Sequence, residues 1–203
     1  MRRNLYLSLL VLLALAMLPF LLDVSQAADD KKKDDEDVKT DVVYWPTPQE
    51  VVDKMLDMAK VKKDDIVYDL GCGDCRIPVT AAKKYGCKAW GFDIDPARVK
   101  DSTENIEKNK VGELVTVKKQ DIFKDDFDIS KASVVTLYLL PELNVRLIPK
   151  LEKLKDGSRI VSHDFDMRGV KPKEKFSMKA KRHDGVEGDH TIYLWVTPLE
   201  KEE

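Results

Sequence analysis

Apolar positions along the chain follow two spacings, one typical of helices and one typical of strands. Between residues 47 and 61, apolar side chains recur every three or four positions, which predicts a helix with one buried face. Thr47 stands at the N-cap position, followed by Pro48 at the first helical position and Glu50 at the third, so we expect a capping box. The short β-rich run over residues 64–74 ends in glycines, which predicts a strand followed by a turn.

The two spacings continue to alternate toward the C-terminus. Further helices are expected over residues 76–86, 95–112 and 144–157, with Asp95 as the N-cap of the second and with the last broken or kinked at Pro149. Further strands are expected over residues 87–95, 114–123, 132–141, 158–167, 174–182 and 190–198. Strands that alternate with helices indicate an α/β fold. We expect a doubly wound, mostly parallel seven-stranded sheet with helices on both faces and a C-terminal antiparallel hairpin.

The N-terminal segment differs in composition from the rest of the chain. Arg2 and Arg3 precede an apolar run over residues 5–22, and the small residues Ser25 to Ala27 follow it. Residues 1–27 therefore read as a signal peptide cleaved after Ala27, or as an uncleaved membrane anchor. Residues 28–40 carry mixed charge with little apolar content and are predicted to form a disordered linker, which leaves 41–203 as the folded domain.

These two readings lead to different locations. A cleaved signal implies an exported domain, periplasmic or secreted, whereas an uncleaved helix implies membrane anchoring through the N-terminal segment alone. The positive-inside rule favours a domain outside the cytoplasm, because the two arginines precede the apolar run.

Charge balance limits the classes of partner. Thirty-five Lys and Arg residues face 37 Asp and Glu residues, for a formal net charge of -2 over 203 residues. This balance shows no strong signal for nucleic-acid binding.

Acidic residues and glycines gather where the predicted parallel strands end. The stretch "VYDLGCGDCRIP" contains Asp69, Gly71 and Gly73 after the first strand, and Asp93 and Asp121 follow the second and third. Ligands of doubly wound sheets bind at the carboxyl ends of the strands, and an acid about 20 residues after a glycine turn is typical of ribose recognition. The ordered series therefore predicts a site for a nucleotide-like ligand.

Two common ligands fit this turn poorly. A P-loop requires a Lys-Ser/Thr pair after its glycines, which "GCGDCRIP" lacks, and nicotinamide dinucleotides favour three glycines. Asp74 lies within the turn, where its charge is expected to repel a pyrophosphate. The turn suits a neutral or cationic ligand that carries hydroxyl groups.

The opening motif "VYDLGCGDCRIPVTAAKKYGCKAWGFDIDP" resembles that of class I, seven-β-strand S-adenosylmethionine-dependent methyltransferases. The resemblance implies S-adenosyl-L-methionine as cofactor. It also implies that the methionine part is lined by Asp69, Gly71 and Gly73, the ribose is bound by Asp93, and the adenine is met by Asp121 and Ile122. Cys75 stands where the family usually has a third glycine.

A narrower resemblance concerns the methyl acceptor. "YWPTPQEVVDKML" and "TLYLLPELN" are similar to a branch with Dot1-like and mitochondrial membrane-associated protein lysine methyltransferases, which implies transfer to a protein lysine amine. The fourth strand lacks the Asn/Asp-Pro-Pro-aromatic pattern, which argues against DNA adenine or glutamine acceptors. No catalytic acid or base is assigned. Tyr138 and Glu142 are candidates to orient the acceptor, and Tyr44 or Trp45 is a candidate lid over the cofactor.

Other functions stay open from the sequence alone. Cys72 and Cys75 form a C-x-x-C, which is also typical of thiol redox proteins. An exported domain of this fold is also compatible with non-catalytic binding of a ligand or partner, because S-adenosylmethionine is a cytosolic metabolite. No metal site is predicted, since the cysteines and histidines lack paired ligand spacing, and His163 is expected to be a strand-end residue.

Overall fold

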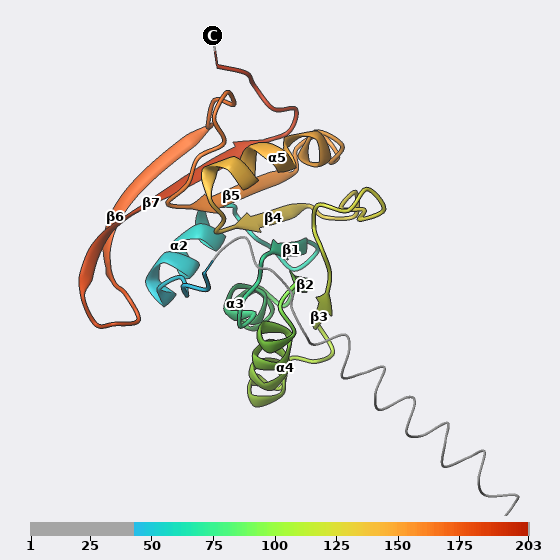
Figure 1. The fold of residues 1–203 in the computed structure, drawn as a ribbon, viewed down its shortest axis with the longest axis vertical. Helices are drawn as coiled ribbons and strands as arrows, with labels where there is room; N and C mark the ends of the chain where they lie inside the picture. Colours follow the sequence, from blue (N-terminus) through green and yellow to red (C-terminus); the bar gives the residue numbers. More distant parts are fainter. Residues whose placement is uncertain (1–42, 203) are drawn as a thin grey trace, which may run out of the picture. The chain divides into compact units, whose positions relative to one another are not determined.

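The computed structural model describes residues 43–202 (Figure 1). The predicted signal peptide or anchor and the predicted linker lie outside the described residues, as do the first two residues of the predicted domain. Among the helices between residues 43 and 202, none is both long and apolar enough to span a bilayer.

Seven strands form one sheet in the order β3-β2-β1-β4-β5-β7-β6. Their bounds are β1 Ile66–Leu70, β2 Lys88–Asp93, β3 Val115–Lys119, β4 Val134–Leu137, β5 Arg159–His163, β6 Glu174–Lys181 and β7 Glu187–Val196. Strands β1 to β5 pair in parallel, and β7 is antiparallel to both β5 and β6. The mixed seven-stranded sheet with its C-terminal hairpin confirms the predicted fold class.

Helices cover both faces of this sheet. Their bounds are α2 Gln49–Met58, α3 Arg76–Tyr85, α4 Pro96–Asn109 and α5 Pro141–Leu151. Buried residues of α2, α3 and α4 share one apolar cluster, whereas those of α5 belong to a second. Adjacent strand residues contribute to opposite clusters: Val134 of β4 packs in the first and Val135 in the second. This alternation is what two buried sheet faces require, and α5 lies across the sheet from α2 and α3 (Figure 1).

The start of α2 differs from the capping box that the sequence predicts. The N-cap residue is Pro48, with no side-chain cap, and the carbonyl oxygen of Pro48 accepts from the backbone N–H groups of Val51 and Val52. Thr47 is only 4% exposed, and its hydroxyl lies 3.1 Å from Nδ1 of His163. The capping prediction is wrong because a distant side chain competes for the same hydroxyl.

Helix α5 begins earlier than predicted. Pro141 occupies its first turn, where proline costs no backbone hydrogen bond, so β4 ends at Leu137 and the predicted strand is too long. Pro149 lies inside the helix near its C-terminal end.

Candidate functional site

The turn between β1 and α3 has an unusual backbone. Gly71, Gly73 and Cys75 all have left-handed φ values, of 83°, 56° and 58°. A Cβ on Gly71 would lie 2.8 Å from the side chain of Leu139, and one on Gly73 would lie 2.3 Å from the Tyr44 ring. Both glycines are therefore required by close packing as well as by φ.

Hydrogen bonds join this turn to the end of β2. The backbone N–H groups of Gly71 and Cys72 donate to the carbonyl of Phe92, at 2.8 and 3.0 Å. The N–H of Gly73 donates to Oδ2 of Asp93 at 2.9 Å, and the N–H of Asp95 donates to Oδ1 at 3.0 Å. Asp93 thus lies directly beside the glycine turn, as the sequence predicts.

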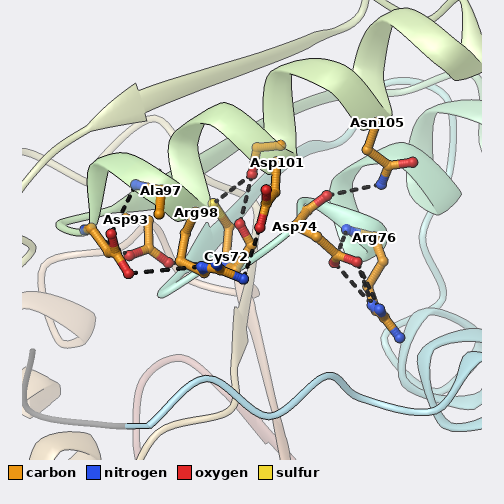
Figure 2. Close-up of polar contacts among 11 residues, drawn as sticks. Cys72, Asp74, Arg76, Asp93, Ala97, Arg98, Asp101 and Asn105 are labelled. Carbon is orange, nitrogen blue, oxygen red and sulfur yellow. Dashed lines mark hydrogen bonds and ion pairs between the residues drawn. The ribbon is translucent and has the colours of Figure 1, made fainter. Parts of the chain in front are cut away.

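Helix α4 supports the turn from its other side (Figure 2). The Ser102 hydroxyl donates to the carbonyl of Gly73 at 2.8 Å, and the Asn105 amide donates to the carbonyl of Asp74 at 2.8 Å. Asp95 caps this helix by accepting from the N–H of Ala97 at 2.8 Å, which confirms the predicted N-cap. The turn is therefore held by the Phe92 carbonyl and the Asp93 carboxylate of β2 and by two side chains of α4.

The charge of Asp74 is compensated. Its carboxylate accepts from Nε of Arg76 at 2.9 Å and from Nη2 at 2.6 Å (Figure 2). Burial acts to raise the pKa of Asp74, but the Arg76 guanidinium outweighs it and holds the pKa below its ordinary value. The repulsion of a pyrophosphate expected from the sequence is therefore reduced by a partner that lies two residues away.

Asp69 lies beneath the turn and is 3% exposed. The Thr136 hydroxyl donates to its Oδ1 at 2.6 Å. Burial raises the pKa of Asp69 to about 8, against the effect of the Thr136 hydrogen bond and with a smaller contribution from the negative charges of Asp93 and Asp74. The carboxyl group is therefore largely neutral at pH 7 in this structure.

The third strand end also joins the site. The N–H of Gln120 donates to the carbonyl of Asp93 at 2.8 Å, and Oδ1 of Asp121 accepts from the N–H of Phe123 at 2.9 Å. Ile122 is 7% exposed and belongs to the second apolar cluster. The structure thus brings together the ends of β1, β2 and β3, where the sequence places its six candidate cofactor residues.

The C-x-x-C thiols are buried. Cys72 and Cys75 are 5% and 0% exposed, and neither is in a disulfide. A hydrogen bond with Cys75 and burial raise the pKa of the Cys72 thiol well above its ordinary value. Redox-active cysteines have lowered pKa values and access to solvent, so this environment disfavours the redox alternative.

The candidate lid residues and the residues proposed to orient the acceptor occupy different environments. The Tyr44 ring packs on Gly73 and has the Arg98 guanidinium 4.6 Å from its centroid. Trp45 is 42% exposed and lies edge-on to His183, with centroids 4.0 Å apart. Of the two candidate lids, Tyr44 is the one that covers the turn.

The other two candidates follow β4. The Tyr138 ring lies 4.0 Å from that of His163 and is stacked with Phe165 at 5.9 Å. Burial, with the charge of Asp164, raises the pKa of Tyr138 to about 12. Glu142 is exposed and paired with Arg168.

One group of polar residues was not predicted to come together. His163 at the end of β5, Asp164 after it and His190 in β7 converge, with the nearest ring and carboxylate atoms 2.9–3.3 Å apart. No sequence spacing reveals this cluster, because the antiparallel pairing of β5 with β7 brings His190 to the other two.

Comparisons with known proteins identify the family of this chain. Residues 69–174 match the family model of the ANTKMT methyltransferase domain. A protein-lysine N-methyltransferase of Saccharolobus islandicus is 50% identical over 157 residues, covering 76% of this chain and 93% of that protein. A ribosomal protein L11 methyltransferase of Alkaliphilus oremlandii is 34% identical over 87 residues, and that match covers 43% of this chain and 27% of that protein.

A solved structure is similar over most of the chain. The crystal structure of an RNA methyltransferase from Salinibacter ruber in complex with S-adenosyl-L-homocysteine matches with a TM-score of 0.68 and 43% identity. The match covers 78% of this chain and 97% of that chain. The chain thus belongs to the ANTKMT methyltransferase domain family and is a class I S-adenosylmethionine-dependent methyltransferase.

Proposed function

We propose that this enzyme methylates the side-chain amine of a protein lysine. The relationship that supports this acceptor most strongly is the 50% identity to a protein-lysine N-methyltransferase over 93% of that protein. We further propose that the cofactor is held at the ends of β1, β2 and β3.

The residues at these strand ends fit the cofactor. Each carboxylate oxygen of Asp93 accepts one backbone N–H and retains a lone pair for the hydroxyl groups of a ribose. Asp69, Gly71 and Gly73 would line the methionine part, and Ile122 would present an apolar side chain to the adenine beside Asp121. Bound S-adenosyl-L-methionine would supply a methyl group on a cationic sulfur, to which the lone pair of a neutral amine nitrogen would form a bond as the S–C bond breaks and S-adenosyl-L-homocysteine leaves.

The acceptor is proposed to approach past β4. The stacked rings of Tyr138 and Phe165 form an aromatic wall after β4 and β5, which suits the apolar stem and cationic end of a lysine side chain. Tyr138 is the proposed orienting residue, because its hydroxyl group keeps its proton and can hydrogen-bond to an amine. Glu142, at the exposed start of α5, stays a candidate for contacts with the acceptor protein.

RNA is the second candidate acceptor, because the similar Salinibacter ruber structure is named an RNA methyltransferase. The formal net charge of -2 provides no general attraction for a polyanion, so we favour protein.

The test uses the full-length protein with methyl-labelled cofactor and two acceptors, a lysine-rich protein mixture and total RNA. We expect label in the protein fraction and its loss when the lysines are acetylated beforehand. Label in RNA alone would overturn the lysine proposal while leaving methyltransferase activity intact.

The site assignment has its own test. Asp93→Asn is expected to weaken cofactor binding by about tenfold or more, since it removes the charged acceptor of the ribose hydroxyls. Asp126→Asn, on an exposed loop residue, is the matched control. Unchanged affinity in a folded Asp93→Asn protein, measured by calorimetric titration, would place the cofactor elsewhere.

Location is proposed from the N-terminal sequence alone. We propose that residues 1–27 direct the domain out of the cytoplasm or anchor it to the membrane. Mass spectrometry of the protein made in its natural host distinguishes the two, because cleavage after Ala27 removes the arginine pair.

A further inference from the structure

His163, Asp164 and His190 form a cluster at the carboxyl end of β5, which we call the histidine–aspartate cluster. His163 is 0% exposed and His190 is 4% exposed, so both rings are withdrawn from solvent. Three atoms face one another: Nε2 of His163, Nδ1 of His190 and Oδ2 of Asp164. The nitrogens are 2.9 Å apart, and they lie 3.2 and 3.3 Å from the oxygen.

Hydrogen bonds alone satisfy this triangle poorly. A neutral imidazole nitrogen carries either one proton or one lone pair in the ring plane, so each of the two nitrogens can form a good hydrogen bond with only one of its two neighbours in the cluster. If Nε2 of His163 donates to Nδ1 of His190, that hydrogen bond uses the one lone pair of Nδ1. The contact between Nδ1 and the Asp164 carboxylate then places two acceptors against each other. A cation at the centre would instead satisfy all three atoms at once.

The separations match those of metal ligands. Three ligands of a tetrahedral zinc ion with bonds of about 2.0–2.1 Å lie about 3.3 Å from one another. The observed separations of 2.9, 3.2 and 3.3 Å approach this value without any rearrangement of the backbone.

Neighbouring groups hold two of the ligands in place. Nδ1 of His163 lies 3.1 Å from the Thr47 hydroxyl, which leaves Nε2 free to face the centre, and Oδ1 of Asp164 accepts from the N–H of Thr191 at 2.8 Å. Such outer partners orient metal ligands in proteins.

The backbone at Asp164 is also unusual. Its φ is 58°, a left-handed conformation that costs a non-glycine residue free energy and is often retained at functional positions. Nε2 of His190 is buried without a hydrogen-bond partner among the described residues, so this ring, unlike that of His163, has no outer partner that orients it.

We propose that the histidine–aspartate cluster binds one divalent transition-metal ion of the zinc class. Two imidazoles and one carboxylate suit zinc better than magnesium or calcium, which favour oxygen ligands. Three protein ligands leave a fourth position for water or for a substrate group. The site adjoins Tyr138, whose ring lies 4.0 Å from that of His163, so the ion would border the proposed acceptor side. The proposal does not depend on which acceptor is methylated.

The experiment is calorimetric titration of zinc chloride into the full-length protein after chelator treatment and under reducing conditions. We expect one zinc ion per chain with a dissociation constant in the micromolar range or tighter, and a rise in Tm. Asp164→Asn should weaken binding by more than about 100-fold, beyond the roughly 10–100-fold that loss of an outer partner costs. Asparagine tolerates the left-handed backbone and can still accept from Thr191, so this variant should fold.

His190→Gln is a second variant that removes a ligand from another strand, and it should also lose binding. His183→Ala is the matched control, since His183 lies beside Trp45 outside the cluster and should bind zinc as the wild type does. Cobalt substitution should give a visible spectrum without a thiolate charge-transfer band. Failure of the wild type to bind zinc, unchanged binding by Asp164→Asn, or a thiolate band would each overturn the proposal.

Discussion

At the scale of single residues, burial controls the ionisation of Asp69. The folded protein keeps this carboxyl group protonated up to a pKa of about 8, whereas the ordinary value is 3.8. A raised pKa means that the folded state binds a proton more tightly than the unfolded state. The resulting stabilisation is complete below about pH 4 and is lost as the pH rises through 8.

Asp69→Asn should remove this dependence, because the amide is neutral at every pH. Between pH 5 and pH 9 we expect the wild type to lose stability relative to Asp69→Asn, on the order of 4 kcal/mol. Urea unfolding at the two pH values measures the difference. Asp126→Asn is the exposed control, and parallel changes in the wild type and Asp69→Asn would show that Asp69 does not titrate in this range.

Cys75 combines a left-handed backbone conformation with a buried side chain. Its φ of 58° suits the glycine that the family usually has there, yet its thiol is completely buried. A Cβ placed on Gly91 of β2 would lie 2.3 Å from Sγ of Cys75 and 2.7 Å from Sγ of Cys72. Sulfur thus fills the space above Gly91, which offsets the strain of the left-handed backbone.

At the scale of elements, β2 and the turn before α3 therefore pack against each other at Gly91. Gly91→Ala should lower the free energy of unfolding by about 2 kcal/mol, the usual cost of overpacking. Cys75→Ala should cost about 1 kcal/mol through lost packing. The double variant should lose less free energy of unfolding than the two single variants lose together, since removal of Sγ relieves the clash with the new methyl group.

Thermal or urea unfolding of the four proteins completes this cycle. Gly112→Ala is the matched control, because no atom of the described part of the chain lies within 4 Å of a Cβ at that position. Strict additivity of the two substitutions would contradict direct packing of Cys75 on Gly91.

At the scale of the whole molecule, a buried ion pair joins strands that are far apart in sequence. Asp65, just before β1, is 4% exposed and accepts from the guanidinium of Arg159 in β5, and the Ser133 hydroxyl donates to it at 2.7 Å. Burial acts to raise the pKa of Asp65, but the hydrogen bonds from Arg159 and Ser133 prevail and lower it below 3.8. The pair therefore stabilises the fold above that pH and is lost as the pH falls through the folded pKa.

Asp65→Asn should destabilise the protein by roughly 3 kcal/mol at pH 7, because it leaves Arg159 without its charged partner. The loss should shrink toward acid pH, where the wild-type carboxylate is also protonated. Asp64→Asn is the control, since Asp64 is exposed and, among residues 43–202, is paired with Lys62 alone, at 3.4 Å. Equal stability of the two variants at pH 7 in urea unfolding would contradict a stabilising role for the buried pair.

Sequence alone determined the features that depend on local pattern. The period of apolar residues and the glycine turn were sufficient to predict seven strands, the helices between them and the α4 cap at Asp95. The predicted strand ends placed Asp93 beside the glycine turn, because parallel strands end at one edge of a sheet. These properties depend on residues close together in the chain or on rules of sheet topology.

Tertiary structure decided the features that depend on distant partners. Thr47 contacts His163 instead of capping α2, and His190 joins His163 only through the pairing of β5 with β7. Burial set the ionisation of Asp69, which no local pattern shows. The physical reason is common to all three: hydrogen bonding and desolvation depend on which atoms fill the space around a side chain, and only the packed fold determines that.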